Sequence, residues 1–388
     1  MPVVGDESIG PDDLDARHTR CVMASRLRDG GKGLTVSFSP KVFIPLTRLC
    51  RDFCSYCTFR ESPHQTQTLY MTPENVLEVA RGGEKLGCRE ALFVLGERPE
   101  ERYSEARQWL NARGYDSTLE YLHEMCKLVL SETALYPHSN AGNMTRSELE
   151  AFKEVNVSLG LMLETISERL CAPGGPHERA PSKHPRARLE TLRQAGELKI
   201  PFTTGLLIGI GETAEERTQA LLAIRDLHNR YGHIQEVIVQ NFQPKPMTVM
   251  RRAPGPSLQH MLDTLAEARI LLGPQMNIQA PPNLAFPYGP GARQAYLNAG
   301  INDWGGISPL TIDYVNPEAP WPELVVLRDE MERSGFQLRA RYPIYPEYIL
   351  HNDGFLNRSL KARLLRESDS DGFIPANGSN CWSGLAAQ

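Results

Sequence analysis

The chain lacks any continuous apolar run of the roughly 18 residues that a membrane-spanning helix needs, and it has no dense block of lysine or arginine. Residues 1–20 also lack the apolar core of a secretory signal. Without a basic block, and with a formal net charge of −5, the sequence has no electrostatic footprint for nucleic acid. We therefore expect a cytoplasmic protein with neither nucleic acid nor membrane as a partner.

Cysteine is also scarce, with 8 among 388 residues. Cys21, Cys88, Cys126, Cys171 and Cys381 are scattered singly along the chain. We expect them to be structural thiols in a reducing compartment, because isolated cysteines most often behave as small buried apolar residues.

The other three cysteines, Cys50, Cys54 and Cys57, form a C-x3-C-x2-C cluster with Tyr56 directly before the last of them. Three thiolates can bind a 4Fe-4S cluster, which usually has four cysteine ligands, and they leave one iron open for a substrate or cosubstrate. The alternative is a zinc knuckle with His64 as fourth ligand. Zinc sites usually have a second ligand pair further on, and no second pair follows here.

Strand-like and helix-like segments alternate through most of the chain. The predicted strands cover residues 34–46, 90–95, 134–139, 157–163, 202–208 and 234–241, with two weaker ones at 277–280 and 302–307. The predicted helices cover residues 73–86, 117–130, 146–155, 185–199, 214–231, 258–272, 292–299 and 322–334. Repeated strand-helix units indicate parallel pairing, so we predict an α/β fold, a single-domain parallel (β/α) barrel of the TIM type.

Three regions follow from this pattern. Residues 1–33 are predicted to form an N-terminal helical cap, with a helix over residues 11–29, and residues 34–341 to form the barrel. Residues 342–388 are predicted to be a C-terminal extension, whose end, from Ser368, is expected to be disordered because it is rich in serine and glycine.

Functional residues of such barrels lie at the C-terminal ends of the strands. The residues that follow the predicted strands are the cysteine cluster, Gly96 with Glu97, Asn140, Glu164, Gly209 and Asn241. We expect all of them at one face of the barrel.

The segment FIPLTRLCRDFCSYCTF, residues 43–59, resembles the radical S-adenosylmethionine superfamily and, within it, the deazaflavin FO synthase subunit 1 family. The resemblance covers residues 35–342. It implies a 4Fe-4S cluster held by Cys50, Cys54 and Cys57, with S-adenosylmethionine bound at the open iron.

The resemblance also implies the contacts of S-adenosylmethionine. Glu97, after Gly96, matches the end of the family's Gly-Gly-Glu segment, although Leu95 replaces the first glycine. Glu164 is expected to bind the ribose hydroxyls, Gly209 to let the backbone approach the adenine, and Tyr56 to pack on the adenine ring. The expected substrate contacts are His138, Asn140, Asn241 and Asp303.

The implied reaction is formation of the deazaflavin 7,8-didemethyl-8-hydroxy-5-deazariboflavin from a hydroxybenzyl-pyrimidine adduct, by hydrogen abstraction, ring closure and loss of ammonia. The implied partners are an electron donor such as ferredoxin or flavodoxin and the adduct-forming subunit 2. Alternatives are a related radical enzyme (that partner subunit, or a menaquinone-pathway or biotin-synthase-like enzyme) and a zinc-stabilised module without catalysis.

Overall fold

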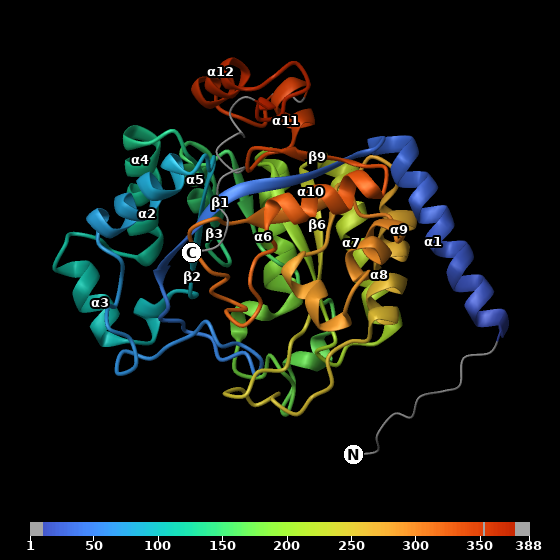
Figure 1. Ribbon diagram of the computed structural model, residues 1–388. Helices are drawn as coiled ribbons and strands as arrows, with labels where there is room; N and C mark the ends of the chain where they lie inside the picture. Colours follow the sequence, from blue (N-terminus) through green and yellow to red (C-terminus); the bar gives the residue numbers. More distant parts are fainter. Residues whose placement is uncertain (1–10, 352–353, 377–388) are drawn as a thin grey trace.

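A computed structural model describes residues 11–351 and 354–376, which form a barrel of parallel strands surrounded by helices (Figure 1). The strands are β1 (Thr35–Thr47), β2 (Glu90–Leu95), β3 (Tyr136–Asn140), β4 (Ser158–Gly160), β5 (Phe202–Ile208), β6 (Ile234–Asn241), β7 (Ile278–Gln279), β8 (Asp303–Ile307) and β9 (Gln337–Ala340). They follow the order β2-β3-β4-β5-β6-β7-β8-β1-β9, and β1 also pairs with β2. The barrel is therefore closed, and the predicted TIM-type fold is confirmed.

Strand β1 closes the barrel because it pairs with both β2 and β8, and it is long enough to pair with β9 as well. Its second half, from Lys41 to Thr47, pairs with β2, and its middle, from Ser37 to Pro40, pairs with β8. Its first residues, Thr35 to Phe38, pair with β9, which the sequence pattern did not indicate.

The helices lie between successive strands. They are α2 (Pro73–Lys85), α3 (Ser104–Asn111), α4 (Thr118–Glu132), α5 (Arg146–Lys153), α6 (Pro185–Glu197), α7 (Ala214–Tyr231), α8 (Leu258–Leu272), α9 (Ala292–Asn298) and α10 (Leu324–Arg333). Thr145 and Thr213 begin α5 and α7 with the predicted capping boxes, in which the threonine hydroxyl and a glutamate satisfy free backbone N–H groups.

The predicted strand over residues 157–163 is too long, because the regular ladder of β4 ends at Gly160. Between Gly160 and Glu164 the chain advances four residues, whereas the paired β5 advances three, from Thr203 to Leu206. One extra residue on one side of a ladder is a β-bulge, a device that redirects side chains beside functional sites. The bulge leaves Glu164 with a φ of 65°, a left-handed conformation that is uncommon outside glycine.

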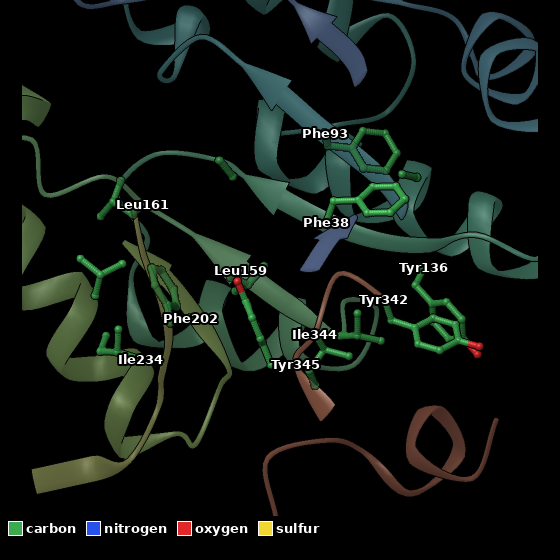
Figure 2. Packing of buried hydrophobic residues seen from close by; sticks show 14 of the residues in the cluster. Phe38, Phe93, Tyr136, Leu159, Leu161, Phe202, Ile234, Tyr342, Ile344 and Tyr345 are labelled. Carbon is green, nitrogen blue, oxygen red and sulfur yellow. The ribbon is translucent and has the colours of Figure 1, made fainter. Parts of the chain in front are cut away.

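The segment after β9 closes the base of the barrel, at the N-terminal ends of the strands. Figure 2 shows Tyr342, Ile344 and Tyr345 lying among apolar side chains from the surrounding strands. Pro343 O accepts hydrogen bonds from Ser158 of β4 and Gln235 of β6. The base is therefore sealed by chain beyond the eight barrel strands.

A buried ion-pair network lies just above this seal. The Arg341 guanidinium donates hydrogen bonds to Asp303 at 2.7 and 2.9 Å and to Glu236 at 2.9 Å, and Tyr345 also donates to Glu236. All four side chains are buried. The network joins β6, β8 and the C-terminal segment.

The C-terminal region continues as α11 (Pro346–Leu350) and α12 (Arg358–Glu367). Residues 368–376 pack back on the barrel: Arg339 pairs with Asp369, and Ile374 N–H donates to Ala340 O at 3.0 Å. The expected disorder from Ser368 thus does not describe these nine residues, and the rest of that tail lies outside the described residues, as does Cys381.

The N-terminal helix α1 (Pro11–Lys32) lies along the outside of the barrel (Figure 1). Its buried Arg28 donates hydrogen bonds to Leu297 O at 2.6 Å and Ile301 O at 3.1 Å, at the end of α9 and beyond. Across residues 11–351 and 354–376, no helix has the length and apolar character that a bilayer crossing demands.

Candidate active site

A cavity of about 370 Å³ occupies the barrel axis and reaches the loops at the C-terminal ends of the strands. The cysteine cluster lines it, because β1 ends at Thr47 and delivers the following loop to this rim. Of the other expected site residues, those that line the cavity are Tyr56, Gly96, Glu97, His138, Asn140, Glu164 and Asn241. Most of the residues that follow the predicted strands therefore lie at one face of the barrel, as expected.

Two expected residues do not line this cavity. Asp303 is fully buried in the ion pair with Arg341, and it also accepts a hydrogen bond from Ser37 Oγ at 2.5 Å. Gly209 turns the chain after β5 with a φ of 92°, and its N–H donates to Glu212 Oε1 at 2.8 Å. The structure thus places Asp303 in the barrel wall and Gly209 in a turn that is closed by Glu212 and packed against Pro256.

The cysteine loop is fastened to the end of β2. Glu97 N–H donates to Cys50 Sγ at 3.2 Å, and Arg51 N–H donates to Glu97 O at 2.7 Å. Gly96 allows this approach, since a Cβ there would lie 1.9 Å from Leu49 O. The glycine before Glu97 is therefore required by the close packing of two backbone segments.

The cysteine side chains suit a cluster that carries positive charge. Burial raises the pKa of Cys50 and of Cys54 to about 12, so bound iron is the kind of group that would favour their thiolate forms. Within the described residues, no three His, Cys, Asp or Glu side chains converge as ligands of one ion. Each thiolate of a 4Fe-4S cluster binds a different iron, so that cluster does not require such convergence.

His64, the fourth ligand of the zinc alternative, is exposed and does not line the cavity.

Glu97 and Glu164 carry carboxylates in different electrostatic surroundings. Burial raises the pKa of Glu97, against the opposing effect of the Arg188 guanidinium. Burial also acts to raise the pKa of Glu164, but the charges of Lys183 and Arg188 outweigh it, and the pKa lies below its usual value. Glu164 is thus an anion held by an ion pair with Lys183.

Tyr56 is fixed by a partner that the sequence did not indicate. Its hydroxyl lies 2.9 Å from His177 Nε2, and the two rings meet edge to face with centroids 5.6 Å apart. Burial lowers the pKa of His177 to about 3, so this imidazole is neutral. The pair holds the Tyr56 ring at the cavity wall.

Several polar cavity residues were not found from the sequence: Lys41, Glu90, Lys183, Arg188, Glu236, Lys245 and Arg341. Lys41 and Glu90 lie at the start of the segments in which β1 and β2 pair with each other. A charged residue beside an apolar run is a sequence signal that could have identified both as cavity residues. Lys183 and Arg188 follow the bulge near the start of α6, in a segment with no motif.

Two buried side-chain amide oxygens in the cavity wall have no hydrogen-bond partner among the described residues. They are Asn241 Oδ1 and Asn283 Oδ1, although the amide nitrogen of each side chain is bonded. A buried acceptor without a donor costs about 1–3 kcal/mol, so a ligand with N–H or O–H groups would relieve both.

Comparison with known proteins identifies the superfamily and a narrower family. Residues 44–224 match the Radical SAM superfamily. The FeFe-hydrogenase maturase HydG from Carboxydothermus hydrogenoformans has a similar fold, with a TM-score of 0.68 and 18% identity over 95% of this chain and 81% of that one. Methylornithine synthase is similar with a TM-score of 0.63 and 19% identity, over 86% of this chain and 95% of that one.

Two curated relatives carry the narrower assignment. The FO synthase of Streptomyces avermitilis is 45% identical over 95% of this chain, which spans only 42% of that protein's length. The 7,8-didemethyl-8-hydroxy-5-deazariboflavin synthase of Methanopyrus kandleri is 52% identical over 87% of this chain and 99% of its own length. A radical SAM barrel that matches almost the whole of such a relative belongs to the 7,8-didemethyl-8-hydroxy-5-deazariboflavin synthase family.

Proposed function

We propose that this radical SAM enzyme converts a 5-amino-5-(4-hydroxybenzyl)-6-(ribitylimino)-dihydrouracil adduct into the deazaflavin 7,8-didemethyl-8-hydroxy-5-deazariboflavin. One S-adenosylmethionine is consumed, and 5′-deoxyadenosine, methionine and ammonia leave. The observation that carries the proposal is the 52% identity over 99% of the Methanopyrus kandleri enzyme. The position of the three cysteines at the mouth of an axial cavity supports it.

Cys50, Cys54 and Cys57 would hold the 4Fe-4S cluster. When bound, the cluster and S-adenosylmethionine supply a 5′-deoxyadenosyl radical that abstracts a hydrogen atom from the substrate. The protein's part is to position the reactants and to keep water away.

Tyr56, Gly96, Glu97 and Glu164 would hold S-adenosylmethionine above the cysteines. Glu97 presents a carboxylate beside Cys50, where an amino group could donate to it. Glu164 presents its carboxylate from the bulge after β4, where ribose hydroxyls could donate. The neighbouring Lys183 and Arg188 provide positive charge for the cosubstrate's own carboxylate. Gly209 lies outside this wall, and a contact from its turn with the adenine remains part of the proposal.

The cavity has two chemically different ends that fit the two ends of the adduct. Phe43, Phe59 and Trp321 form an apolar wall beside Cys57, with Phe43 and Trp321 stacked at 5.3 Å. The hydroxybenzyl group would lie against this wall. The deeper end is lined by Lys41 and Glu90, which suit the hydroxyls of the ribityl chain.

Four further residues complete the proposed substrate contacts. His138 and Asn140 share a hydrogen bond of 3.2 Å near the polar end, and Asn241 presents its free acceptor oxygen. Asp303 would act through Arg341, which lines the cavity while Asp303 does not.

This chain spans only 42% of the length of the Streptomyces avermitilis FO synthase, which supports the proposal that another protein carries out the adduct-forming step. We propose a separate adduct-forming subunit as that partner, and a ferredoxin or flavodoxin as the electron donor. The cytoplasm, where such donors and reduced thiols occur, is the proposed location.

The direct test supplies anaerobically reconstituted protein with reductant, S-adenosylmethionine and the adduct. We expect fluorescent deazaflavin and 5′-deoxyadenosine in equal amounts. If the protein instead consumes tyrosine and the ribitylamino-pyrimidine, it is the adduct-forming enzyme. Cys54→Ala should abolish both products, whereas Cys88→Ala, at a buried thiol outside the cavity, should retain them.

A further inference from the structure

Three arginines surround one phenylalanine of the cysteine loop. The guanidinium carbons of Arg60, Arg102 and Arg179 lie 3.8, 4.0 and 4.7 Å from the centroid of the Phe53 ring. Phe53 lies between Cys50 and Cys54, and its N–H donates to Arg179 O at 2.8 Å. We call these four residues the Phe53 patch. It places three positive charges directly on the loop that would hold the cluster.

The positive charges of the Phe53 patch are not paired with carboxylates in the described part of the chain. Over the part of the chain that the structure describes, none of its three arginines forms a salt bridge, whereas the neighbouring Arg51 and Arg98 pair with Glu101 and Glu148. The whole chain has a net charge of −5, so general basicity does not explain the patch. Three like charges around one ring repel each other, and an anionic partner would relieve that repulsion.

The surroundings of the patch favour a protein partner over a small anion. Arg102 and Arg179 are exposed, so a large molecule can reach them. Met250 N–H donates to Ser55 O at 3.1 Å and brings the loop after β6 beside the cysteine loop. In that loop the residues Met247 and Val249 are 92% and 79% exposed. Arginine and exposed apolar side chains together are typical of protein interfaces.

We propose that the Phe53 patch is the docking surface of an acidic, low-potential one-electron carrier protein of the flavodoxin or ferredoxin class. The proposal rests on the proposed function, because it is the cluster that needs the electron. One electron passes from the carrier, which is oxidised, to the cluster, which is reduced, and no bond is made or broken. Because Phe53 lies within the cysteine loop, it would give the electron a short path from the carrier to the cluster.

The test compares Arg102→Glu/Arg179→Glu with a control, Arg230→Glu/Arg333→Glu, which changes the net charge equally at exposed positions on α7 and α10. Calorimetry measures binding of oxidised flavodoxin to each cluster-loaded protein. Stopped-flow absorbance measures cluster reduction by reduced flavodoxin and, separately, by dithionite, which needs no docking. We expect the patch variant to lose at least tenfold in flavodoxin affinity and reduction rate, with iron content and dithionite reduction unchanged.

Equal flavodoxin binding by the patch variant and the control would overturn the proposal. If the patch variant loses iron, the unmodified enzyme is used to test the proposal instead. Its reduction by flavodoxin should slow at least tenfold between about 0.01 and 0.15 M salt, because the screening length falls from about 30 to 8 Å over this range. A rate independent of salt would contradict docking by charge. Failure to form deazaflavin even with dithionite would refute the proposed function instead and leave the binding result standing.

Discussion

The backbone N–H of Glu97 donates a hydrogen bond to the sulfur of Cys50 across 3.2 Å, and so the end of β2 fixes one ligand of the proposed cluster. This contact also sets where the Glu97 carboxylate lies relative to that ligand. Two functional groups that are distant in the sequence are thereby positioned by one piece of backbone packing.

Gly96→Ala should break this arrangement. The new Cβ would lie 1.9 Å from Leu49 O and 2.6 Å from the Cys50 Cβ, distances that force the cysteine loop to move. We expect iron and sulfide content after anaerobic reconstitution to fall at least severalfold. Gly30→Ala is the matched control, because a Cβ at this exposed helical glycine meets nothing within 4 Å. That change should keep full iron content and stabilise α1 by about 0.5–1 kcal/mol. Equal iron content in the two variants would show that the close approach is dispensable.

Glu164→Gln should weaken S-adenosylmethionine binding. The substitution keeps the shape of the side chain but removes the charge that accepts hydrogen bonds, and a hydrogen bond to a charged group is worth about 1.5–3 kcal/mol. The dissociation constant measured by calorimetry should rise about tenfold or more. Glu168→Gln, at an exposed carboxylate paired with Arg186, should leave the constant unchanged. Similar constants for the two variants would remove Glu164 from the proposed site.

Arg341→Met should destabilise the barrel strongly. It leaves Asp303 and Glu236 buried without their shared cation, and breaking a buried ion pair from one side costs about 3–5 kcal/mol. Arg339→Met, two residues away, removes partly exposed pairs with Asp369 and Asp371 and should cost about 1 kcal/mol or less. Urea unfolding of both variants checks the difference. Equal losses would mean that the buried network contributes no more than a surface pair.

His233 should make the protein less stable as the pH falls below neutrality. Burial lowers the pKa of His233 to about 3, and its Nε2 lies 2.9 Å from Leu192 O, so the folded state keeps the imidazole neutral. In the unfolded chain the same group takes up a proton near pH 6.5. A folded pKa below the unfolded one gives stability that is present above about pH 6.5 and is lost as the pH falls toward 3.

His233→Gln should therefore reduce the slope of the unfolding free energy between about pH 6 and 4 by up to about 1.4 kcal/mol per pH unit. Urea unfolding at several pH values measures this slope. His228, whose pKa burial also lowers, adds to the slope in both proteins, so the difference between them isolates His233. Parallel curves would show that His233 is protonated in the folded state.

The barrel and the cysteine loop could be predicted because their signals are local. Strand β5, strand β6 and the helix between them have the predicted bounds. The apolar run of each strand and the capping box at the start of the helix can be recognised from neighbouring residues alone. Arg341 could not be assigned in this way, because its partners Glu236 and Asp303 are 105 and 38 residues away. The bulge before Glu164 was missed for a related reason: the extra residue is defined only by its pairing with β5.

The seal that residues 342–345 place beneath the strands makes the cavity blind at its lower end, where Pro343 lines it. With the reactants placed as proposed, they would arrive in order of depth, so the molecule destined for the polar floor has to enter before the one that will cover it. Products must depart in the reverse order. A steady-state study that varies both reactants would show this as compulsory sequence rather than random addition.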